Sequence, residues 1–244
     1  MVVLVLNNEK LPYEEQIKEE LISKYKNIVT IVKNINSKDT NVVLGNKNIN
    51  IYGDGFLYDN LGEYKFKISP NSFYQVNPIQ TEKLYTIGVR KAKISKKDVV
   101  FDLYCGIGTI SLFMSKFAGK IYGVEIVEQA IEDAKENAKL NNVDNVDFFA
   151  GDCEIVVNDL INKKEIVPDV VMVDPPRKGL DNTTIDNLKK INANKIVYIS
   201  CNPATLMRDL TKLEKTYDIE MIQPVDMFPF TKHCEVITVL KLKK

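Results

Sequence analysis

Short apolar runs rich in β-branched residues alternate with stretches of helical character from residue 98 to residue 244. This alternation predicts an α/β fold in which helices cover both faces of a doubly wound sheet. The first five apolar runs contain few polar residues, as is typical of parallel strands buried on both faces. We therefore expect a seven-stranded, mostly parallel sheet. Its first five strands are predicted at residues 99–104, 120–126, 146–149, 169–174 and 195–201.

The last two strands of this sheet are predicted at residues 219–225 and 235–242. The short connection between them leaves little room for a helix, so they should pair antiparallel as a hairpin does. Helices are predicted at residues 109–117 and 128–140, the latter because apolar residues recur there at helical spacing.

The N-terminal 75 residues have a different pattern, with short strands broken by Asn, Gly and Asp. We predict a small α+β subdomain at residues 1–75 and a catalytic domain at residues 76–244. Asn77 should cap a helix that begins with Pro78 and carries Gln80 three residues after the cap. Strands in the subdomain are predicted at residues 2–6, 28–32, 42–44, 49–52 and 64–68, with a helix at 13–25.

Composition excludes several classes of protein. Lys plus Arg and Asp plus Glu both total 33, so the net charge does not indicate a polyanionic partner, although a local basic patch could still bind RNA. The four cysteines lie far apart without a C-x-x-C pair, which argues against a zinc ribbon, an iron–sulfur cluster or a disulfide framework, and no metal site is predicted. No apolar run approaches the roughly 20 residues of a membrane span, and no signal peptide is visible. We therefore expect a cytoplasmic protein.

A glycine-containing loop follows the first strand of the sheet and opens a helix. Gly106 and Gly108 would let the backbone turn tightly near a ligand at the helix N-terminus. The third glycine of the dinucleotide fingerprint is absent, because Ser111 stands there. Asp102 would repel a pyrophosphate and suits a cationic ligand such as the amino-acid end of S-adenosylmethionine.

Two more acidic residues stand at successive strand ends. Glu125 lies where a ribose-binding carboxylate belongs in a Rossmann-like unit, and Asp152 could accept from an adenine amino group. Taken alone, either residue would be interpreted as a solvated residue at a strand end or as a helix cap, and not as a cofactor ligand. Three acids at one edge of a sheet favour S-adenosylmethionine over a nicotinamide cofactor.

A second group of residues indicates chemistry on a planar base. Asp174 begins an Asp-Pro-Pro-Arg turn, and Arg177 stands where a base-amine methylase usually has an aromatic residue. Cys201 ends the following strand, and its thiol, with a free pKa of about 8.5, could attack C6 of a pyrimidine and so activate C5 for methylation. Glu235 is the preferred base for the C5 proton, because partial burial raises a carboxyl pKa. His233, the only histidine, is either a substrate-binding residue or a structural hydrogen-bonding residue.

Five motifs in order resemble the RNA (uracil-5-)-methyltransferases, S-adenosylmethionine enzymes that make 5-methyluridine in ribosomal or transfer RNA. The motifs are Ser-Pro-Asn-Ser-Phe-Tyr-Gln-Val-Asn at 69–77, Asp-x-x-Cys-Gly-x-Gly at 102–108, Asp-Pro-Pro-Arg at 174–177, Ser-Cys-Asn-Pro-Ala-Thr at 200–205, and Asp-Met-Phe-Pro-x-Thr-x-His-x-Glu at 226–235. The resemblance implies a Rossmann-like methyltransferase fold, Cys201 as nucleophile and Glu235 as base. It also implies cofactor contacts at Gln75, Tyr104, Gly106, Gly108, Thr109, Glu125, Asp152 and Asp174.

The resemblance further implies an RNA partner, ribosomal rather than transfer RNA. Phe73 is the aromatic residue expected to stack on a flipped base, and Asp174, Arg177 and His233 are expected near that base. Members that act on ribosomal RNA often begin with an oligonucleotide-binding barrel and a four-cysteine iron–sulfur segment. Since neither pattern is visible here, the chain should correspond to the C-terminal catalytic portion of such an enzyme.

Two alternatives remain open. A cytosine-C5 methyltransferase uses the same addition chemistry, although its nucleophile usually follows Pro or Thr, whereas Cys201 follows Ser200. The chain could also be a cofactor-binding or RNA-binding fragment that does not turn over without further domains.

Overall fold

The computed structural model describes residues 1–40 and 42–244. Those residues form two compact units, which are described separately. Unit 1 comprises residues 1–59 and 66–73, and unit 2 comprises residues 60–65 and 74–244. The domain boundary after residue 75 stays a prediction, since the units group residues 60–65, 74 and 75 with the C-terminal part.

Unit 1 contains a three-stranded sheet in the order β1-β2-β3, with β1 parallel and β3 antiparallel to β2. Its elements are β1 (Val2–Leu6), α1 (Glu14–Lys24), β2 (Ile31–Ile35) and β3 (Lys47–Tyr52). The strand predicted at residues 42–44 is wrong, because Asn36 Nδ2 donates to the carbonyl oxygens of Val42 and Val43 in an irregular segment. Sequence reasoning missed β4 (Leu57–Leu61), which pairs with β5 (Tyr64–Ile68) and whose central residues are polar and exposed.

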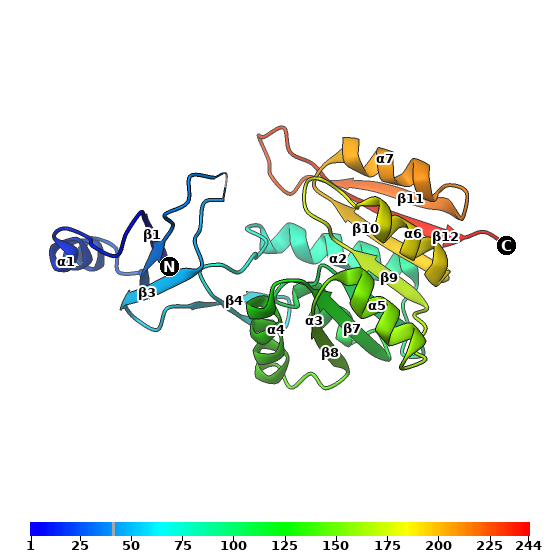
Figure 1. The fold of residues 1–244 in the computed structure, drawn as a ribbon, viewed down its shortest axis with the longest axis horizontal. Coiled ribbons are helices and arrows are strands. Elements are labelled where there is room, and N and C mark those ends of the chain that lie inside the picture. The colour runs from blue at the N-terminus through cyan, green and yellow to red at the C-terminus, as the bar shows by residue number, and fades with distance from the viewer. Residues whose placement is uncertain (41) are drawn as a thin grey trace. The chain divides into compact units, whose positions relative to one another are not determined.

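Unit 2 is an α/β layer structure around a seven-stranded sheet, as predicted (Figure 1). The strand order is β11-β12-β10-β9-β6-β7-β8, and only β12 runs antiparallel to its neighbours, β10 and β11. The predicted antiparallel pairing of the last two strands is therefore confirmed. In chain order the elements are α2 (Pro78–Ala92), β6 (Val99–Leu103), α3 (Thr109–Ser115), β7 (Lys120–Glu125), α4 (Glu128–Leu140), β8 (Val146–Ala150), α5 (Cys153–Asn162), β9 (Val170–Val173), α6 (Asn182–Ile191), β10 (Lys195–Ser200), α7 (Pro203–Leu213), β11 (Tyr217–Val225) and β12 (Glu235–Leu242).

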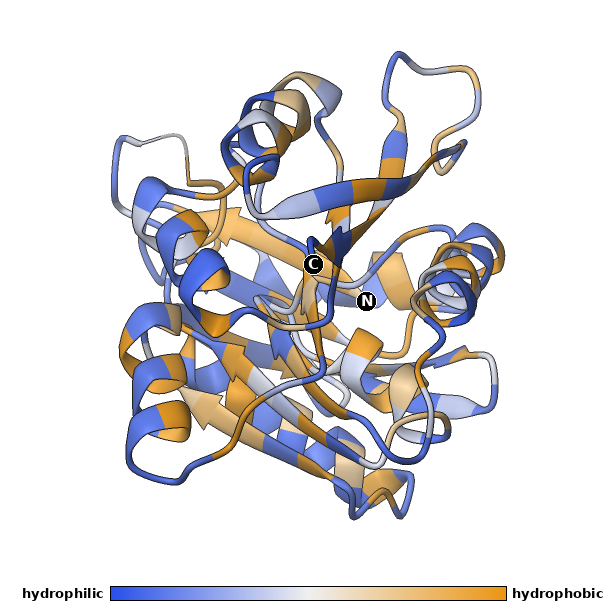
Figure 2. Ribbon diagram, turned by 90° about the vertical axis from the view of Figure 1, so that its right-hand side faces the viewer, coloured by the Kyte–Doolittle hydropathy of each residue, from blue (hydrophilic) through white to orange (hydrophobic). Residues whose placement is uncertain are grey.

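The central strands form the core because their residues are buried on both faces. Every residue of β9 is buried, as are the last five residues of β10. The helices that flank the sheet alternate hydrophobic and hydrophilic stripes in Figure 2, so each can turn an apolar side inward. Burial on both faces explains why these strands appear in the sequence as continuous apolar runs.

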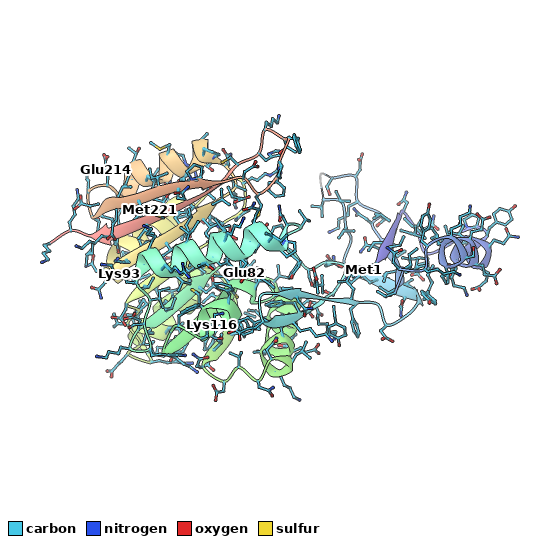
Figure 3. The ribbon with its side chains drawn as sticks, turned by 180° about the vertical axis from the view of Figure 1, so that it is seen from behind. Met1, Glu82, Lys93, Lys116, Glu214 and Met221 are labelled. Carbon is cyan, nitrogen blue, oxygen red and sulfur yellow. The ribbon has the colours of Figure 1, made fainter. Side chains whose placement is uncertain are left out.

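Helix α2 packs closely against the central strands of unit 2. Its N-cap is Asn77, whose side chain accepts from the Gln80 amide at 3.2 Å, and Pro78 opens the first turn, as predicted. Figure 3 shows α2 in front of the sheet, with Glu82 in its N-terminal half and Lys93 just past its end. A Cβ at Gly88 would lie 2.8 Å from Ile237 Cδ1, so the absence of a side chain there permits this close approach.

The segment that follows β9 is held by a buried carboxylate on α7. Asp209 is completely buried, and its Oδ2 accepts from the Leu180 amide and from the Tyr198 hydroxyl, each at 2.8 Å. Its Oδ1 accepts from Arg208 Nε at 2.9 Å, and Arg208 also donates to the Leu180 carbonyl. These bonds join the exit of one central strand to the helix that follows the next strand.

Replacing Asp209 with alanine should lower the free energy of unfolding by about 3–5 kcal/mol, because it leaves a buried hydroxyl and a buried amide without their acceptor. Urea denaturation measures this loss. Thr211→Ala, at an exposed position of the same helix, is the matched control and should change stability by about 0.5 kcal/mol or less. Equal stability of the two variants would contradict the role of the carboxylate.

Candidate active site

Strand pairing brings Cys201 and Glu235 to the same edge of the sheet. In the antiparallel ladder Ser200 of β10 lies opposite Val236 of β12, and Cys201 and Glu235 are the next residues outward on the two strands. In the parallel ladder Tyr198 lies beside Val173, so Asp174 leaves β9 at that edge as well. The three predicted residues therefore meet at the carboxyl edge of the parallel strands, although they are far apart in sequence.

The three groups differ in exposure but influence one another electrostatically. Glu235 is 3% exposed, whereas Cys201 and Asp174 are half-buried and Arg177 is exposed. Burial raises the pKa of the Cys201 thiol, the carboxylates of Glu235 and Asp174 raise it further, and the Arg177 guanidinium lowers it. The thiol is therefore protonated at neutral pH in the free protein.

Both carboxyl groups of the site hold protons more tightly than ordinary acids do. Burial raises the pKa of Glu235, with Arg177 acting in the opposite direction. Burial, Glu235 and Asp102 together raise the pKa of Asp174 to about 8. A carboxylate with a raised pKa is a stronger base than one in water, so Glu235 in its ionised form binds a proton more readily than an ordinary carboxylate does.

Replacing Arg177 with glutamine should shift alkylation of Cys201 to higher pH. Thiolate is the reactive form, so losing the cation that lowers the thiol pKa decreases the reactive fraction at a given pH, and raising the pH restores it. Because Arg177 is exposed and screened, we expect only about a threefold loss of rate at neutral pH. Mass spectrometry of iodoacetamide labelling at Cys201 measures the profile, with the exposed neighbour Lys178→Gln as control. An equal shift in both variants would argue against a specific effect of Arg177.

The glycine loop lies at the ends of the next two strands of the sheet. Tyr104, Gly106 and Gly108 have φ values of 66°, 53° and 82°, in the left-handed region that favours glycine. A Cβ at Gly108 would lie 2.8 Å from the Phe148 ring, whereas one at Gly106 would meet nothing within 4 Å. The backbone at Gly106 therefore borders open space into which a ligand can approach.

Glu125 supports this loop from the end of β7. Its Oε2 accepts from the Gly106 amide at 3.3 Å, and its Oε1 accepts from the Val127 amide at 3.0 Å. Asp152 is exposed and caps α5 by accepting from the Glu154 amide at 2.8 Å, the helix-cap alternative to ligand binding.

Asp102 carries a buried oxygen that the described residues do not satisfy. Its Oδ2 accepts from Ser111 Oγ at 2.5 Å, while Oδ1 has no hydrogen-bond partner in the part of the chain that the structure describes. Burial raises the pKa of this carboxyl to about 7, with the nearby Glu125 adding to the rise. An unsatisfied acceptor beneath the glycine loop fits a cationic or hydrogen-donating ligand.

The remaining predicted site residues differ in exposure and in their surroundings. Gln75 is 8% exposed, and the Tyr104 hydroxyl lies 3.3 Å from Thr184 Oγ1. Phe73 belongs to unit 1, where it is 73% exposed, and its role as a stacking residue stays a prediction. His233 is exposed, and its ring centroid lies 6.3 Å from that of Phe228.

Sequence reasoning missed Tyr85 of α2. This side chain is 1% exposed, its hydroxyl lies 3.4 Å from Thr109 Oγ1, and the charges of Asp174 and Asp102 add to the effect of burial in raising its pKa. Tyr85 therefore lies near both halves of the site. Nothing in the local pattern marked it, because an apolar stripe on a helix commonly contains a tyrosine.

The family model of the tRNA (uracil-5-)-methyltransferases matches residues 10–243. The chain belongs to this family. The predicted resemblance and the predicted methyltransferase fold are thereby confirmed.

Relatives and solved structures agree with this assignment. The chain is 48% identical over 242 residues to an uncharacterized RNA methyltransferase of Clostridium acetobutylicum, covering 99% of this chain and 52% of that protein. It is 46% identical over 243 residues to one of Bacillus cereus, covering 99% and 53%. The crystal structure of Pyrococcus abyssi tRNA (uracil-54, C5)-methyltransferase with S-adenosyl-L-homocysteine matches with a TM-score of 0.74 and 29% identity, covering 98% of this chain and 55% of that one. This member of the family thus spans about half the length of the curated relatives it matches.

Among the helices of residues 1–40 and 42–244, none is long and apolar enough to cross a membrane. Within the same residues, no group of three or more His, Cys, Asp or Glu side chains is arranged to hold a metal ion.

Proposed function

We propose that this chain is the catalytic part of an RNA (uracil-5-)-methyltransferase, with S-adenosylmethionine as methyl donor and Cys201 as nucleophile. The observation that carries the proposal is that Cys201 directly follows β10, opposite Glu235 at the start of the adjacent strand β12. Asp174 directly follows β9, the neighbour of β10 on its other side. Membership of the family supports the same reaction. A cytoplasmic location, predicted from the sequence, is part of the proposal.

The proposed reaction begins at the thiol. Cys201, which is half-buried, first gives its proton to water. The thiolate then forms a bond to C6 of uracil, and the electrons of the C5–C6 double bond move into an enolate. C5 of the enolate is nucleophilic, and a bound S-adenosylmethionine would supply its methyl group there and leave as S-adenosylhomocysteine. Glu235 then accepts the C5 proton, the C5–C6 double bond re-forms, and the sulfur–C6 bond breaks to return the thiolate.

The residues at the glycine loop fit a bound S-adenosylmethionine, which supplies an electrophilic methyl group on a sulfonium sulfur. The unsatisfied Asp102 Oδ1 suits the amino group of the methionyl end, and the open space at Gly106 admits the ligand beside the loop. Glu125 and Asp152 are proposed to reach the ribose and the adenine. The other proposed cofactor contacts are Gln75, Tyr104, Gly108, Thr109 and Asp174.

The target base is proposed to lie between Asp174 and Cys201, with Arg177 and His233 at the exposed rim and Phe73 as a stacking residue. Ribosomal RNA is the proposed substrate. Transfer RNA is the second candidate, because the Pyrococcus abyssi relative is by its title a transfer-RNA enzyme.

Methyl transfer from labelled S-adenosylmethionine to unmodified ribosomal and transfer RNA tests the proposal. We expect 5-methyluridine at a defined position after nuclease digestion and mass analysis, and a covalent complex with RNA that contains 5-fluorouridine, which has no C5 proton to release. 5-Methylcytidine in place of 5-methyluridine would overturn the base assignment in favour of a cytosine-C5 enzyme.

The short span of the chain relative to its relatives favours one further candidate, a fragment that binds but does not turn over. Calorimetric binding of S-adenosylmethionine without methyl transfer to either RNA would support this candidate. Methyl transfer by the same preparation would exclude it.

A further inference from the structure

The loop between β11 and β12 presents a phenylalanine to solvent. Phe230 is fully exposed, with a relative accessibility of 108%, and its φ of 66° lies in the left-handed region. For a bulky side chain this conformation is a genuine outlier that costs conformational free energy. An aromatic residue held outward at such a cost is poorly explained by packing within the described chain.

The loop is anchored on both sides of Phe230. On one side Met227 is 1% exposed, and its carbonyl accepts from Asn77 Nδ2 at 3.1 Å. On the other side Thr231 Oγ1 donates to the Phe228 carbonyl at 2.8 Å and accepts from the His233 amide at 3.2 Å. The exposed ring is therefore carried by a hydrogen-bonded turn.

This turn leads directly into the proposed site, because Glu235 begins β12 two residues after His233. In Figure 1 the β11–β12 loop extends beyond the end of the sheet next to α7, the helix that follows Cys201. The loop therefore projects at the edge where substrate would enter. Lys232, like Phe230 and His233, is exposed, so an aromatic ring and a cation lie two residues apart in sequence.

We propose that Phe230 stacks on an RNA base next to the methylated uridine, while Lys232 faces the backbone phosphate. This inference rests on the proposed function. A uridine that enters the site must leave its stack, which exposes the faces of its neighbours. An aromatic side chain can cover such a face whatever the base, and a lysine at its side offsets the charge of the phosphate.

Capture of 5-fluorouridine RNA by the full chain tests the inference. Phe230→Ala should raise the RNA concentration that gives half-maximal capture by about tenfold, because one stacked base is lost. Phe230→Trp should stay within about threefold of the wild type, since its ring can still stack. Binding of S-adenosylmethionine and the melting temperature should be the same in all variants.

The matched control is Leu140→Ala, at another exposed apolar position, which should leave capture unchanged. Leu140 ends α4, and a helix that returns after a parallel strand ends at the opposite edge of the sheet. If Phe230→Ala captures RNA at the same half-maximal concentration as the wild type, the inference is overturned and the proposed function is left intact. Loss of S-adenosylmethionine binding or of thermal stability in Phe230→Ala would overturn it in favour of a structural role. If the wild type captures no RNA, the proposed function and the inference both fail.

Discussion

Replacement of Cys201 by alanine is expected to abolish covalent capture of 5-fluorouridine RNA and to reduce methyl transfer by on the order of 10⁴-fold or more. The proposed reaction has no second route, because uracil C5 attacks a methyl group only after a nucleophile has added at C6. Denaturing gels measure capture, and labelled methyl incorporation measures turnover. S-adenosylmethionine binding should persist, since Cys201 lies outside the glycine loop.

Two of the other three thiols provide the controls for this experiment. Cys105 is 4% exposed, and burial raises its pKa well above the usual value. Burial also raises the pKa of Cys153 to about 12, so neither thiol is a competent nucleophile near neutral pH. Cys153→Ala should therefore capture RNA as the wild type does. A covalent complex formed by Cys201→Ala would contradict the assignment of the nucleophile.

Replacement of Glu235 by glutamine is expected to separate formation of the adduct from its release. The amide keeps the size of the buried side chain but cannot accept the C5 proton, so turnover should fall by about 10²–10⁴-fold. The Cys201 thiolate can still add to C6, and the methylated adduct then has no partner that takes its proton. A covalent complex with ordinary uridine RNA should therefore accumulate and be visible on denaturing gels. The wild type releases this complex quickly.

Glu214→Gln is the matched control, because Glu214 is an exposed carboxylate just past the end of α7 (Figure 3). It should turn over at the wild-type rate and accumulate no complex. Turnover by Glu235→Gln within about threefold of the wild type would remove Glu235 from the role of base, given the size of the expected loss.

The sequence predicted the large sheet well because buried strands have a local signature. A strand covered on both faces must be apolar along its length, so β6, β7, β9 and β10 are visible without knowledge of their neighbours. Strand β4 has no such signature, since its central residues are polar and exposed, and it was missed. Residues 42–44 are apolar but form no strand. The side-chain amide of Asn36 donates hydrogen bonds to the carbonyl oxygens of Val42 and Val43 instead.

For the candidate site, too, the sequence could predict some features and not others. Motif residues at strand ends could be assigned to one edge from the alternation alone, because parallel strands end on the same side of a sheet. The sequence could not predict whether neighbouring charges raise or lower the pKa of Cys201. Burial and the charges of Asp174, Glu235 and Arg177 decide that direction, and these residues come from separate segments. Tyr85 was missed for the same reason, since only the packing of α2 on the sheet brings it near Asp174.

By itself, the sequence determined which residues are proposed to carry the chemistry of this protein and at which strand ends they stand, since both follow from local periodicity and short motifs. The tertiary structure decided how those residues act on one another. Only the folded chain removes water from Asp102, sets Glu235 across from Cys201 and leaves the Phe230 ring exposed. Desolvation and Coulomb interactions depend on distances between segments that a linear pattern does not contain.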